Sequence, residues 1–418
     1  MLDVNIQKFL LQEAKTRFLR YVQIDTTSAD NSGNHPSTPG QLNLAKCLYA
    51  ELAELGFENL FLDEKGYVYA ILPASPGVTC PAVTFCSHLD TSPSESGAAV
   101  KPQIHENYAG GVITFPDDPQ LTLSPQESPE LKKYIGGNII TASGKTLLGA
   151  DDKAGIAEIM AALAALKQYP HLSHPELRIV FTPDEEVGDG TSGIDLSRLG
   201  KVGYTVDGGD IGELEDECFN ALRVNLVFHG STVHAGYAKN RLVNACAIAA
   251  RFVAALPEYE TPEHTEIREG FYHLFGIKGD ENSAELAMIL RDFEAEKNQS
   301  RLEYLKQTIH LFELRYRGLK VDLTVIDQYQ NMKATLDLHP EVTQMAAKAI
   351  EAAGLTVNKK AIRGGTDGAR LTFMGLPTPN LFTGGLLYHS RKEWIPEIAL
   401  QKAAETILHL CRLWAEKT

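Results

Sequence analysis

Five short segments of the chain place histidine, aspartate or glutamate after strand-like apolar runs or beside glycines. These segments contain His88 and Asp90, Asp151 and Asp152, the acidic run 184–186, Asp207, and His389. Imidazole nitrogens and carboxylate oxygens are ligands for zinc-like divalent ions at sites that use no cysteine. A carboxylate beside such ions can also transfer protons. The residue types therefore point to metal-assisted acid–base chemistry.

Each segment alone also has an ordinary structural explanation. Asp151 and Asp152 precede an alanine-rich helix, and capping its N-terminus explains one aspartate better than two adjacent ones. The run 184–186 could be a solvated loop, although three successive acids repel one another unless cations hold them. His88 and Asp90 could simply close a strand. The metal hypothesis depends on all five segments together.

Helical and strand-like patterns alternate through the first half of the chain. Helices are expected at 6–22, 41–55 and 155–168, and strands at 66–72, 82–87 and 177–182. This alternation predicts an α/β sheet covered by helices, with functional residues at the carboxyl ends of its strands. Residues 91–137 are rich in Pro, Gly, Ser and Asn and predict an irregular excursion.

Residues 217–330 follow a different pattern. Strands are expected at 221–228, 270–277, 284–292 and 319–325, and helices at 242–255 and 294–316. The resulting order βαββαβ is that of a ferredoxin-like unit. A helix at 340–353 then resumes the first pattern. We therefore expect a catalytic domain formed by 1–216 and 331–418, interrupted by an inserted domain at 217–330.

Composition excludes several classes of function. The 418 residues carry 39 basic and 54 acidic side chains, a net charge of −15, whereas nucleic-acid or anionic-membrane binding needs a basic surface. No apolar run reaches the roughly 18 residues of a membrane span. The N-terminus resembles an amphipathic helix rather than a signal peptide. Six scattered cysteines favour a reducing compartment, so a cytoplasmic location is expected.

Two catalytic motifs fail on inspection. Ser143–Thr146 resembles the end of a phosphate-binding loop, but Ile139 stands where that motif requires its first glycine. The nucleophile motif GxSxG is absent from the sequence.

The motif-bearing segments resemble, in order and spacing over nearly the whole chain, the M20 family of di-zinc peptidases. The segments are SHLDTSP, LLGADDKAGIAEIM, FTPDEEVGDG, YTVDGG, VHAGYAKNRLVNA and RGGTDGARL. The resemblance implies a zinc-exopeptidase-like catalytic domain with a mixed sheet between helices, and an inserted domain that serves as a lid or in dimerisation.

The resemblance also implies roles for individual residues. Two Zn²⁺ ions would be bound by His88, Asp151, Glu186, Asp207 and His389. Asp151 would bridge the ions, and each ion would take one histidine, one further acid and a shared water. Asp90 would orient the His88 ring, and Glu185 would be the general base. A cis peptide is expected between Asp151 and Asp152.

Four further residues are implied in substrate binding. His234 would stabilise the oxyanion from the inserted domain, which requires lid closure or a neighbouring subunit. Asn244, Arg291 and Arg363 would hold the substrate backbone or its C-terminal carboxylate. Two positions depart from the family pattern: Ala235 stands where proline is frequent, and Ser390 where glycine is frequent.

The resemblance implies a metallo-aminopeptidase that hydrolyses the N-terminal peptide bond of short peptides, chiefly tripeptides. The alternatives are another M20 reaction (a dipeptidase, carboxypeptidase or N-acyl amide deacylase) and a non-catalytic scaffold. The expected partners are peptide substrates, with a homodimer formed through the inserted domain. Nucleic acid and membrane are not expected as partners.

Overall fold

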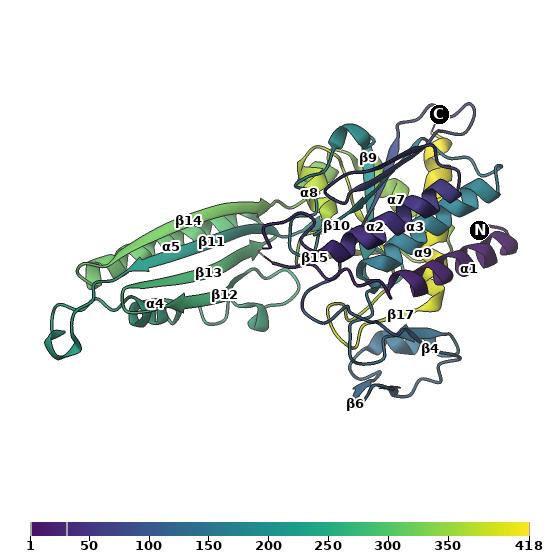
Figure 1. Cartoon of the computed structure of the whole chain (residues 1–418). Helices are drawn as coiled ribbons and strands as arrows, with labels where there is room; N and C mark the ends of the chain where they lie inside the picture. The colour runs from purple at the N-terminus through teal and green to yellow at the C-terminus, as the bar shows by residue number, and fades with distance from the viewer. Residues whose placement is uncertain (1, 31, 418) are drawn as a thin grey trace. The chain divides into compact units, whose positions relative to one another are not determined.

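The computed structural model describes residues 2–30 and 32–417, which form two compact units (Figure 1). The first unit consists of 1–216, 334–360 and 366–418, and the second of 217–333 and 361–365. Within the described residues, none of the helices has both the length and the apolar character needed to cross a bilayer.

A mixed eight-stranded sheet forms the centre of the first unit. Its order is β1 (Asn59–Leu62), β2 (Val68–Leu72), β8 (Leu177–Thr182), β3 (Val83–His88), β9 (Val202–Gly208), β16 (Asn380–Phe382), β10 (Glu213–Cys218) and β15 (Asn358–Ile362). Strands β8, β3, β9 and β16 lie next to one another in the sheet and are parallel. The pairs β1–β2, β2–β8 and β10–β16 are antiparallel. The predicted α/β class with a mixed sheet is confirmed.

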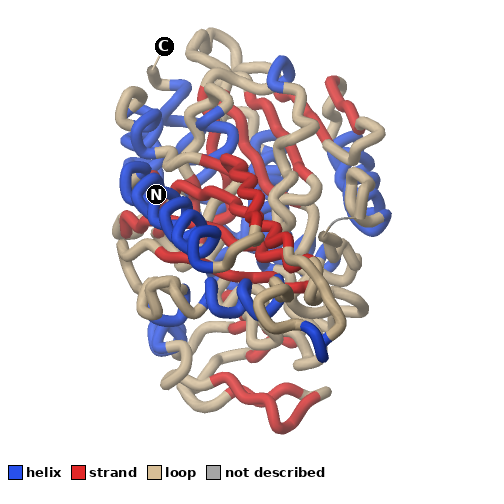
Figure 2. The backbone as a smooth tube through the Cα atoms, turned by 90° about the vertical axis from the view of Figure 1, so that its left-hand side faces the viewer, coloured by secondary structure: helices blue, strands red, loops and turns tan. Residues whose placement is uncertain are grey.

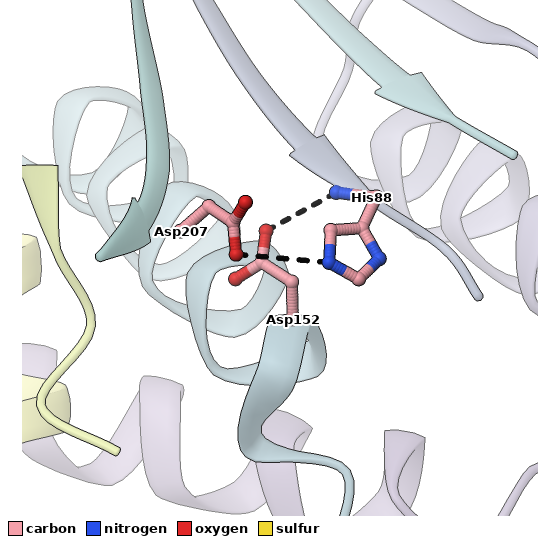
Figure 3. A group of neighbouring side chains, drawn as sticks. All are labelled: His88, Asp152 and Asp207. Atoms are coloured by element: carbon pink, nitrogen blue, oxygen red, sulfur yellow. Dashed lines mark hydrogen bonds and ion pairs between the residues drawn. The ribbon is translucent and has the colours of Figure 1, made fainter. Parts of the chain in front are cut away.

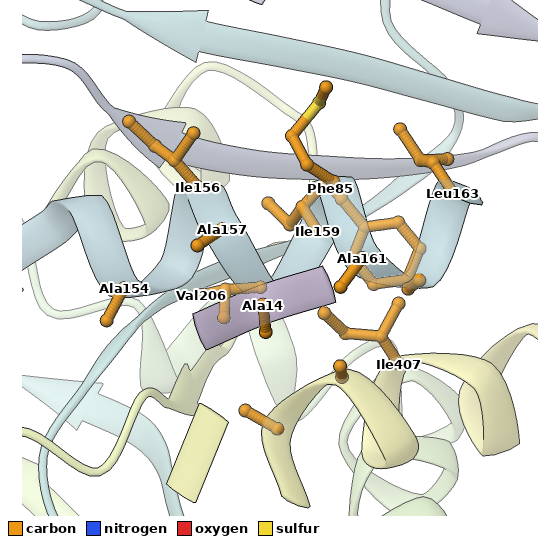
Figure 4. Close-up of a cluster of buried hydrophobic side chains, with 14 of the residues drawn as sticks. Ala14, Phe85, Ala154, Ile156, Ala157, Ile159, Ala161, Leu163, Val206 and Ile407 are labelled. Carbon is orange, nitrogen blue, oxygen red and sulfur yellow. The ribbon is translucent and has the colours of Figure 1, made fainter. Parts of the chain in front are cut away.

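Helices cover this sheet. They are α1 (Val4–Tyr21), α2 (Pro39–Glu54), α3 (Ala150–Gln168), α7 (Pro340–Ala352), α8 (Asp367–Phe373) and α9 (Glu397–Ala415). The four-residue helix α6 (Lys333–Leu336) precedes α7 in the chain. The alanine-rich α3 is buried between α1, α9 and strands β3 and β9 (Figure 4). A Cβ added at Gly155 would lie 1.9 Å from the Val206 carbonyl oxygen, so only glycine lets α3 approach β9 this closely. This approach brings the start of α3 to the carboxyl end of β9.

The segment expected to be irregular contains regular structure, so that prediction was wrong in part. It forms β4 (Gln103–His105), the hairpin β5 (Ile113–Phe115) and β6 (Asp118–Leu123), the 3₁₀ turn Pro129–Tyr134 and, just beyond it, β7 (Ile139–Thr141). The hairpin lies at the lower end of Figure 2. Strand β7 pairs with β17 (Trp394–Pro396) from the far end of the chain. Trp394 completes a small core with Phe115, Leu123 and Ile139, a long-range partner that local composition does not reveal.

The second unit has the expected element order. It contains β11 (Asn220–His229), α4 (Ala245–Val253), β12 (Phe271–Gly279), β13 (Ser283–Asp292), α5 (Ala295–Arg315) and β14 (Lys320–Tyr329). The strands form an antiparallel sheet in the order β12-β13-β11-β14, the ferredoxin-like arrangement. Alternate residues of β11, including Val224, Leu226 and Phe228, form a core with α4 and α5.

Candidate metal centre

The centre begins at the carboxyl ends of three adjacent parallel strands. His88 is the last residue of β3, which lies between β8 and β9. Asp207 is the next-to-last residue of β9, and the acidic run 184–186 follows β8. Parallel strands end at the same edge of a sheet, so residues distant in sequence meet there.

The buried His88 imidazole contacts carboxylates through one nitrogen and Asp90 through the other. Its Nε2 lies 2.9 Å from Asp151 Oδ1 and 3.6 Å from Asp207 Oδ1. Its Nδ1 lies 3.0 Å from the Asp90 carbonyl oxygen and 3.4 Å from Asp90 Oδ1. Asp90 therefore fixes the ring orientation so that Nε2 faces the acids.

Asp151 lies between the two histidines. Its second oxygen, Oδ2, is 3.0 Å from His389 Nε2, which in turn lies 2.9 Å from Glu186 Oε1. Each imidazole thus meets Asp151 and one further acid, Asp207 at His88 and Glu186 at His389. The structure brings together all five residues named as candidate ligands.

The adjacent carboxylate, Asp152, is fully buried. Its Oδ2 accepts a hydrogen bond from the His88 backbone N–H at 3.1 Å (Figure 3). The same oxygen accepts a hydrogen bond from the Ser87 hydroxyl. Its Oδ1 is buried and has no hydrogen-bond partner in the described part of the chain. The expected cis peptide joins Asp151 and Asp152. Both residues have non-helical backbone angles, so their side chains diverge before the regular turns of α3 begin.

Among the residues that the structure describes, two triads have ligand atoms within 4.8 Å of one another, close enough for one cation to contact all three. They are His88–Asp151–Glu186 and His88–Asp152–Asp207. The donors are nitrogen and oxygen, the set that zinc-like ions accept.

The electrostatics indicate an excess of buried negative charge. Burial and repulsion by Asp151 raise the pKa values of Asp207 and Glu186 to about 7. Burial opposes protonation of His389, but hydrogen bonds with Asp151 and Glu186 still raise its pKa to about 11. Burial likewise opposes protonation of His88, yet its carboxylate partners raise its pKa well above the usual range. Protons on the two imidazoles would offset part of this negative charge. The residues present fit a bound cation, which would replace those protons.

The turn after β8 carries the candidate base. The Asp90 carboxylate accepts the backbone N–H groups of Glu185 at 3.0 Å and Glu186 at 3.1 Å. The turn is not helical. A non-helical backbone is needed here because the adjacent side chains of Glu185 and Glu186 must both reach one centre. Burial, together with repulsion by Asp367, Asp207 and Glu186, raises the pKa of Glu185 well above its ordinary value.

Sequence reasoning missed three residues that hold the centre in place. Asn380 Oδ1 accepts the Asp207 backbone N–H at 3.1 Å. The Tyr388 hydroxyl donates to the Gly208 carbonyl oxygen at 2.9 Å. Glu393 accepts the backbone N–H groups of Leu148 and Gly149, just before α3, and of Asp151 at its start. All three act on segments distant in sequence, so no local pattern marks them.

The four candidate substrate residues all lie in the second unit. His234 is exposed, and its Nδ1 accepts the Gly236 N–H at 3.1 Å. Asn244 caps α4, with Oδ1 accepting the Ala247 N–H at 2.9 Å. The Arg291 Nη1 donates to the Arg363 carbonyl oxygen at 3.4 Å.

Arg363 was expected in the catalytic segment 331–418, but the structure groups it with the second unit. Its guanidinium donates to the carbonyl oxygens of Thr265, Ile267 and Glu269, and to the Thr265 hydroxyl at 2.9 Å. The side chain therefore holds the loop before β12.

Comparison with known proteins gives the chain a family. Residues 147–413 match the model of peptidase family M20/M25/M40. Peptidase T of Clostridium acetobutylicum is 45% identical over 408 residues, covering 97% of this chain and 100% of the relative. Peptidase T of Halothermothrix orenii is 46% identical over 402 residues, covering 96% and 98%.

Solved structures agree. The crystal structure of aminopeptidase PepT from Bacillus cereus is 25% identical with a TM-score of 0.74, covering 97% of this chain and 99% of that one. A tripeptidase structure from Staphylococcus aureus, 22% identical with a TM-score of 0.76, shares the fold over 97% and 99%. The family resemblance inferred from the motifs is confirmed. The chain belongs to peptidase family M20/M25/M40, within its peptidase T group, and is a hydrolase.

Proposed function

We propose that this hydrolase is a metal-dependent aminopeptidase that removes the N-terminal residue of short peptides, chiefly tripeptides. The observation that carries the proposal is the placement of Asp151 between His88 and His389, each with a further carboxylate. The names of the relatives, peptidase T and tripeptidase, support the reaction and the substrate length.

In this proposal the chain holds two Zn²⁺ ions. His88 and Asp207 would hold one ion, His389 and Glu186 would hold the other, and Asp151 would serve both. When bound, such ions polarise the scissile carbonyl group and lower the pKa of a water molecule. A neighbour in structure, YXEP of Bacillus subtilis, is described as a dinuclear metal-binding peptidase of the M20 family and shares the fold with a TM-score of 0.66.

Glu185 is the proposed general base. It accepts a proton from the attacking water and then delivers it to the amine that leaves as the peptide bond breaks. Its place in the same turn as Glu186 supports this role, because the backbone of both residues is held by Asp90. Asp90 thereby orients the base as well as His88.

We propose that the second unit supplies substrate contacts. His234 is exposed, and since its Nδ1 accepts a hydrogen bond, its Nε2 is the donor for the oxyanion. Arg291 also suits anion binding, since its buried Nε has no hydrogen-bond partner among the described residues. Asn244 and Arg363 are weaker candidates because both side chains already bind backbone groups. The same proposal includes a second unit that acts as a lid. It also includes a homodimer formed through the second unit, and the molar mass from light scattering in solution tests the dimer.

We also infer a cytoplasmic location. Cys86 and Cys411 are buried thiols that form no disulfide, as expected for a chain in a reducing compartment. Subcellular fractionation tests this location.

Mass-spectrometric digestion tests the reaction. The substrates are an unblocked tripeptide, its N-acetylated form, a dipeptide and a tetrapeptide, each with and without chelator. We expect release of only the N-terminal residue of the free tripeptide, abolished by chelation. Cleavage of the blocked peptide or the dipeptide instead would assign the centre to another M20 reaction. No cleavage by metal-loaded protein would favour the scaffold, which the presence of Glu185, Asp90 and all five candidate ligands argues against.

Substitution of Glu185 tests the mechanism. Glu185→Gln removes the group that accepts the proton, so we expect kcat to fall about 10²- to 10⁴-fold. Metal content, measured by atomic emission, should stay at the wild-type value because Glu185 is not a proposed ligand. Unchanged turnover would remove Glu185 from the mechanism.

A further inference from the structure

A buried carboxylate outside the candidate ligand set holds the segment that carries Asp151. Glu393 is 1% exposed. Its Oε2 accepts the backbone N–H groups of Leu148 and Gly149, both at 2.8 Å, and its Oε1 accepts that of Asp151 at 3.1 Å. We infer that Glu393 is a positioning residue that sets the metal affinity of the centre by fixing Asp151 between His88 and His389. The inference rests on the proposed function, in which Asp151 contacts both ions.

The segment before α3 needs such a partner. The first N–H groups of a helix have no acceptor within the helix, and a Ser, Thr, Asp or Asn side chain usually caps them. Here the N-cap residue is Gly149, with φ +84°, which has no side chain to accept a hydrogen bond. Glu393 supplies the missing acceptor from a segment more than two hundred residues further along the chain.

Glu393 binds the backbone of Asp151, and His389 contacts its side chain. They belong to one short segment that leads into β17, and β17 is anchored by pairing with β7. His389 Nε2 lies 3.0 Å from the Asp151 carboxylate, and Glu393 binds the Asp151 backbone N–H. The segment 389–393 therefore fixes both the backbone and the side chain of the residue proposed to be shared by the two ions.

The hydrogen bonds require a carboxylate at position 393. An ionised carboxylate only accepts hydrogen bonds, and both of its oxygens are used here. A glutamine side chain has nearly the same shape but carries an NH₂ group, which would face one or more of the N–H donors. Glu393→Gln therefore leaves at least one buried N–H group without an acceptor and loosens the segment around Asp151.

The test compares Glu393→Gln with Glu405→Gln, a matched change in the same unit. Glu405 is also buried and accepts hydrogen bonds from Gln7 Nε2 and Lys402 Nζ, both at 2.9 Å, but it lies on α9 and contacts no candidate ligand. The readouts are Zn²⁺ affinity by competition with a chromophoric chelator, the visible spectrum of the Co²⁺-loaded protein, and the Tm of the chelated protein.

We expect Glu393→Gln to weaken Zn²⁺ binding about 10- to 100-fold, the usual effect of removing a group that supports a ligand, and to alter the Co²⁺ spectrum. Glu405→Gln should lower the Tm of the chelated protein yet leave affinity and spectrum unchanged. A purely structural role for Glu393 would likewise affect only the Tm, and that result would overturn the inference.

A second variant covers the case in which Glu393→Gln does not fold. Glu393→Asp keeps the charge but shortens the side chain, so it cannot reach all three N–H groups, and Zn²⁺ affinity should again fall. If a folded Glu393→Asp variant binds Zn²⁺ with wild-type affinity, the inference about Glu393 is overturned but the proposed function is not. A wild-type chain that binds no Zn²⁺, or an Asp151→Asn variant that binds it normally, would overturn the proposed centre and the inference with it.

Discussion

Asp90 shows how one residue orients several functional groups. Its carbonyl oxygen lies 3.0 Å from His88 Nδ1, and its carboxylate accepts the backbone N–H groups of Glu185 and Glu186. Two candidate ligands and the candidate base therefore depend on one fully buried side chain and its backbone.

Asp90→Asn tests this dependence. Asparagine has one oxygen and one NH₂ group, so one of the two N–H groups at 185–186 loses its acceptor. We expect kcat/KM to fall about 10- to 100-fold. Asp195→Asn is the control, because Asp195 also accepts a backbone N–H, that of Ser197, but from an exposed position. A similar loss in both variants would argue against a specific role for Asp90.

For single residues, the sequence predicts the candidate functional side chains that directly follow strands. It does not reveal supporting side chains whose hydrogen-bond partners are distant in sequence. Histidine and acids at strand ends indicated the centre because parallel strands end together. Glu393, Asn380 and Tyr388 bind backbone groups of segments more than a hundred residues away along the chain. Their types are common in loops, and only the folded chain reveals their partners.

Among the elements, the turn after β8 is held by the N-terminal part of the chain. Asp184 has φ +60°, in the left-handed region. Its buried carboxylate accepts hydrogen bonds from Gln41 Nε2 at 2.6 Å and from the Ser37 N–H at 2.7 Å, and Gln41 Oε1 accepts the Asp184 N–H at 3.0 Å. The start of α2 thus fixes the turn that carries Glu185.

Gln41→Ala should lower the free energy of unfolding by about 1–3 kcal/mol, because it leaves the buried Asp184 backbone N–H without its acceptor and removes one hydrogen bond to the Asp184 carboxylate. Urea denaturation measures the change. Gln12→Ala is the matched control, since Gln12 bonds Thr16 on the exposed face of α1, and its effect should stay within about 0.5 kcal/mol. Equal effects would contradict the role given to Gln41.

His35 gives this turn a pH dependence. Its Nδ1 lies 3.2 Å from Asp184 and 3.3 Å from Asp189, and its Nε2 lies 3.2 Å from the Tyr67 hydroxyl. The nearby Asp184 carboxylate raises the pKa of His35, although burial opposes the shift. A raised pKa in the folded state stabilises the fold below the unfolded value and loses that effect as the pH rises through the folded value.

The stability difference between wild type and His35→Gln should therefore be larger at about pH 6 than at about pH 9. Chemical denaturation at both pH values measures it. A difference that does not change with pH would show that the His35 charge contributes nothing to the stability of the turn.

The sequence also predicts elements unevenly. Strands β3 and β8 and the six elements of the second unit follow from alternating or continuous apolar runs. Strands β4, β5 and β7 do not, because each is only three residues long and β7 depends on β17 for its pairing. The first residues of α3 were also unreadable as helix, because Asp151 and Asp152 have non-helical angles.

In the molecule as a whole, metal removal should destabilise the first unit. Binding to the folded state alone contributes about 3–4 kcal/mol when free metal exceeds Kd by two to three orders of magnitude. We expect chelation to lower the Tm in scanning calorimetry and added Zn²⁺ to restore it. An unchanged Tm after verified metal removal would contradict a centre linked to folding.

Phe228→Ala provides the comparison for the second unit. It opens the core against α4 and α5, where the Phe228 ring packs 5.3 Å from that of Phe252, and should cost about 3–5 kcal/mol. Because the two units have separate cores, this cost should be the same with and without metal. A cost that depends on metal would show that the units are coupled.

The order in which the candidate ligands occur along the chain has a consequence for biosynthesis. His88, Asp151, Glu186 and Asp207 precede the second unit, whereas His389 and its neighbour Glu393 follow it. Strand β16, which lies between β9 and β10 in the sheet, also comes from this late segment. A chain still growing on the ribosome therefore has neither the complete centre nor the complete sheet until its last part is made. Copies that end before His389 would lack one of the proposed metal ligands and are therefore expected to be inactive.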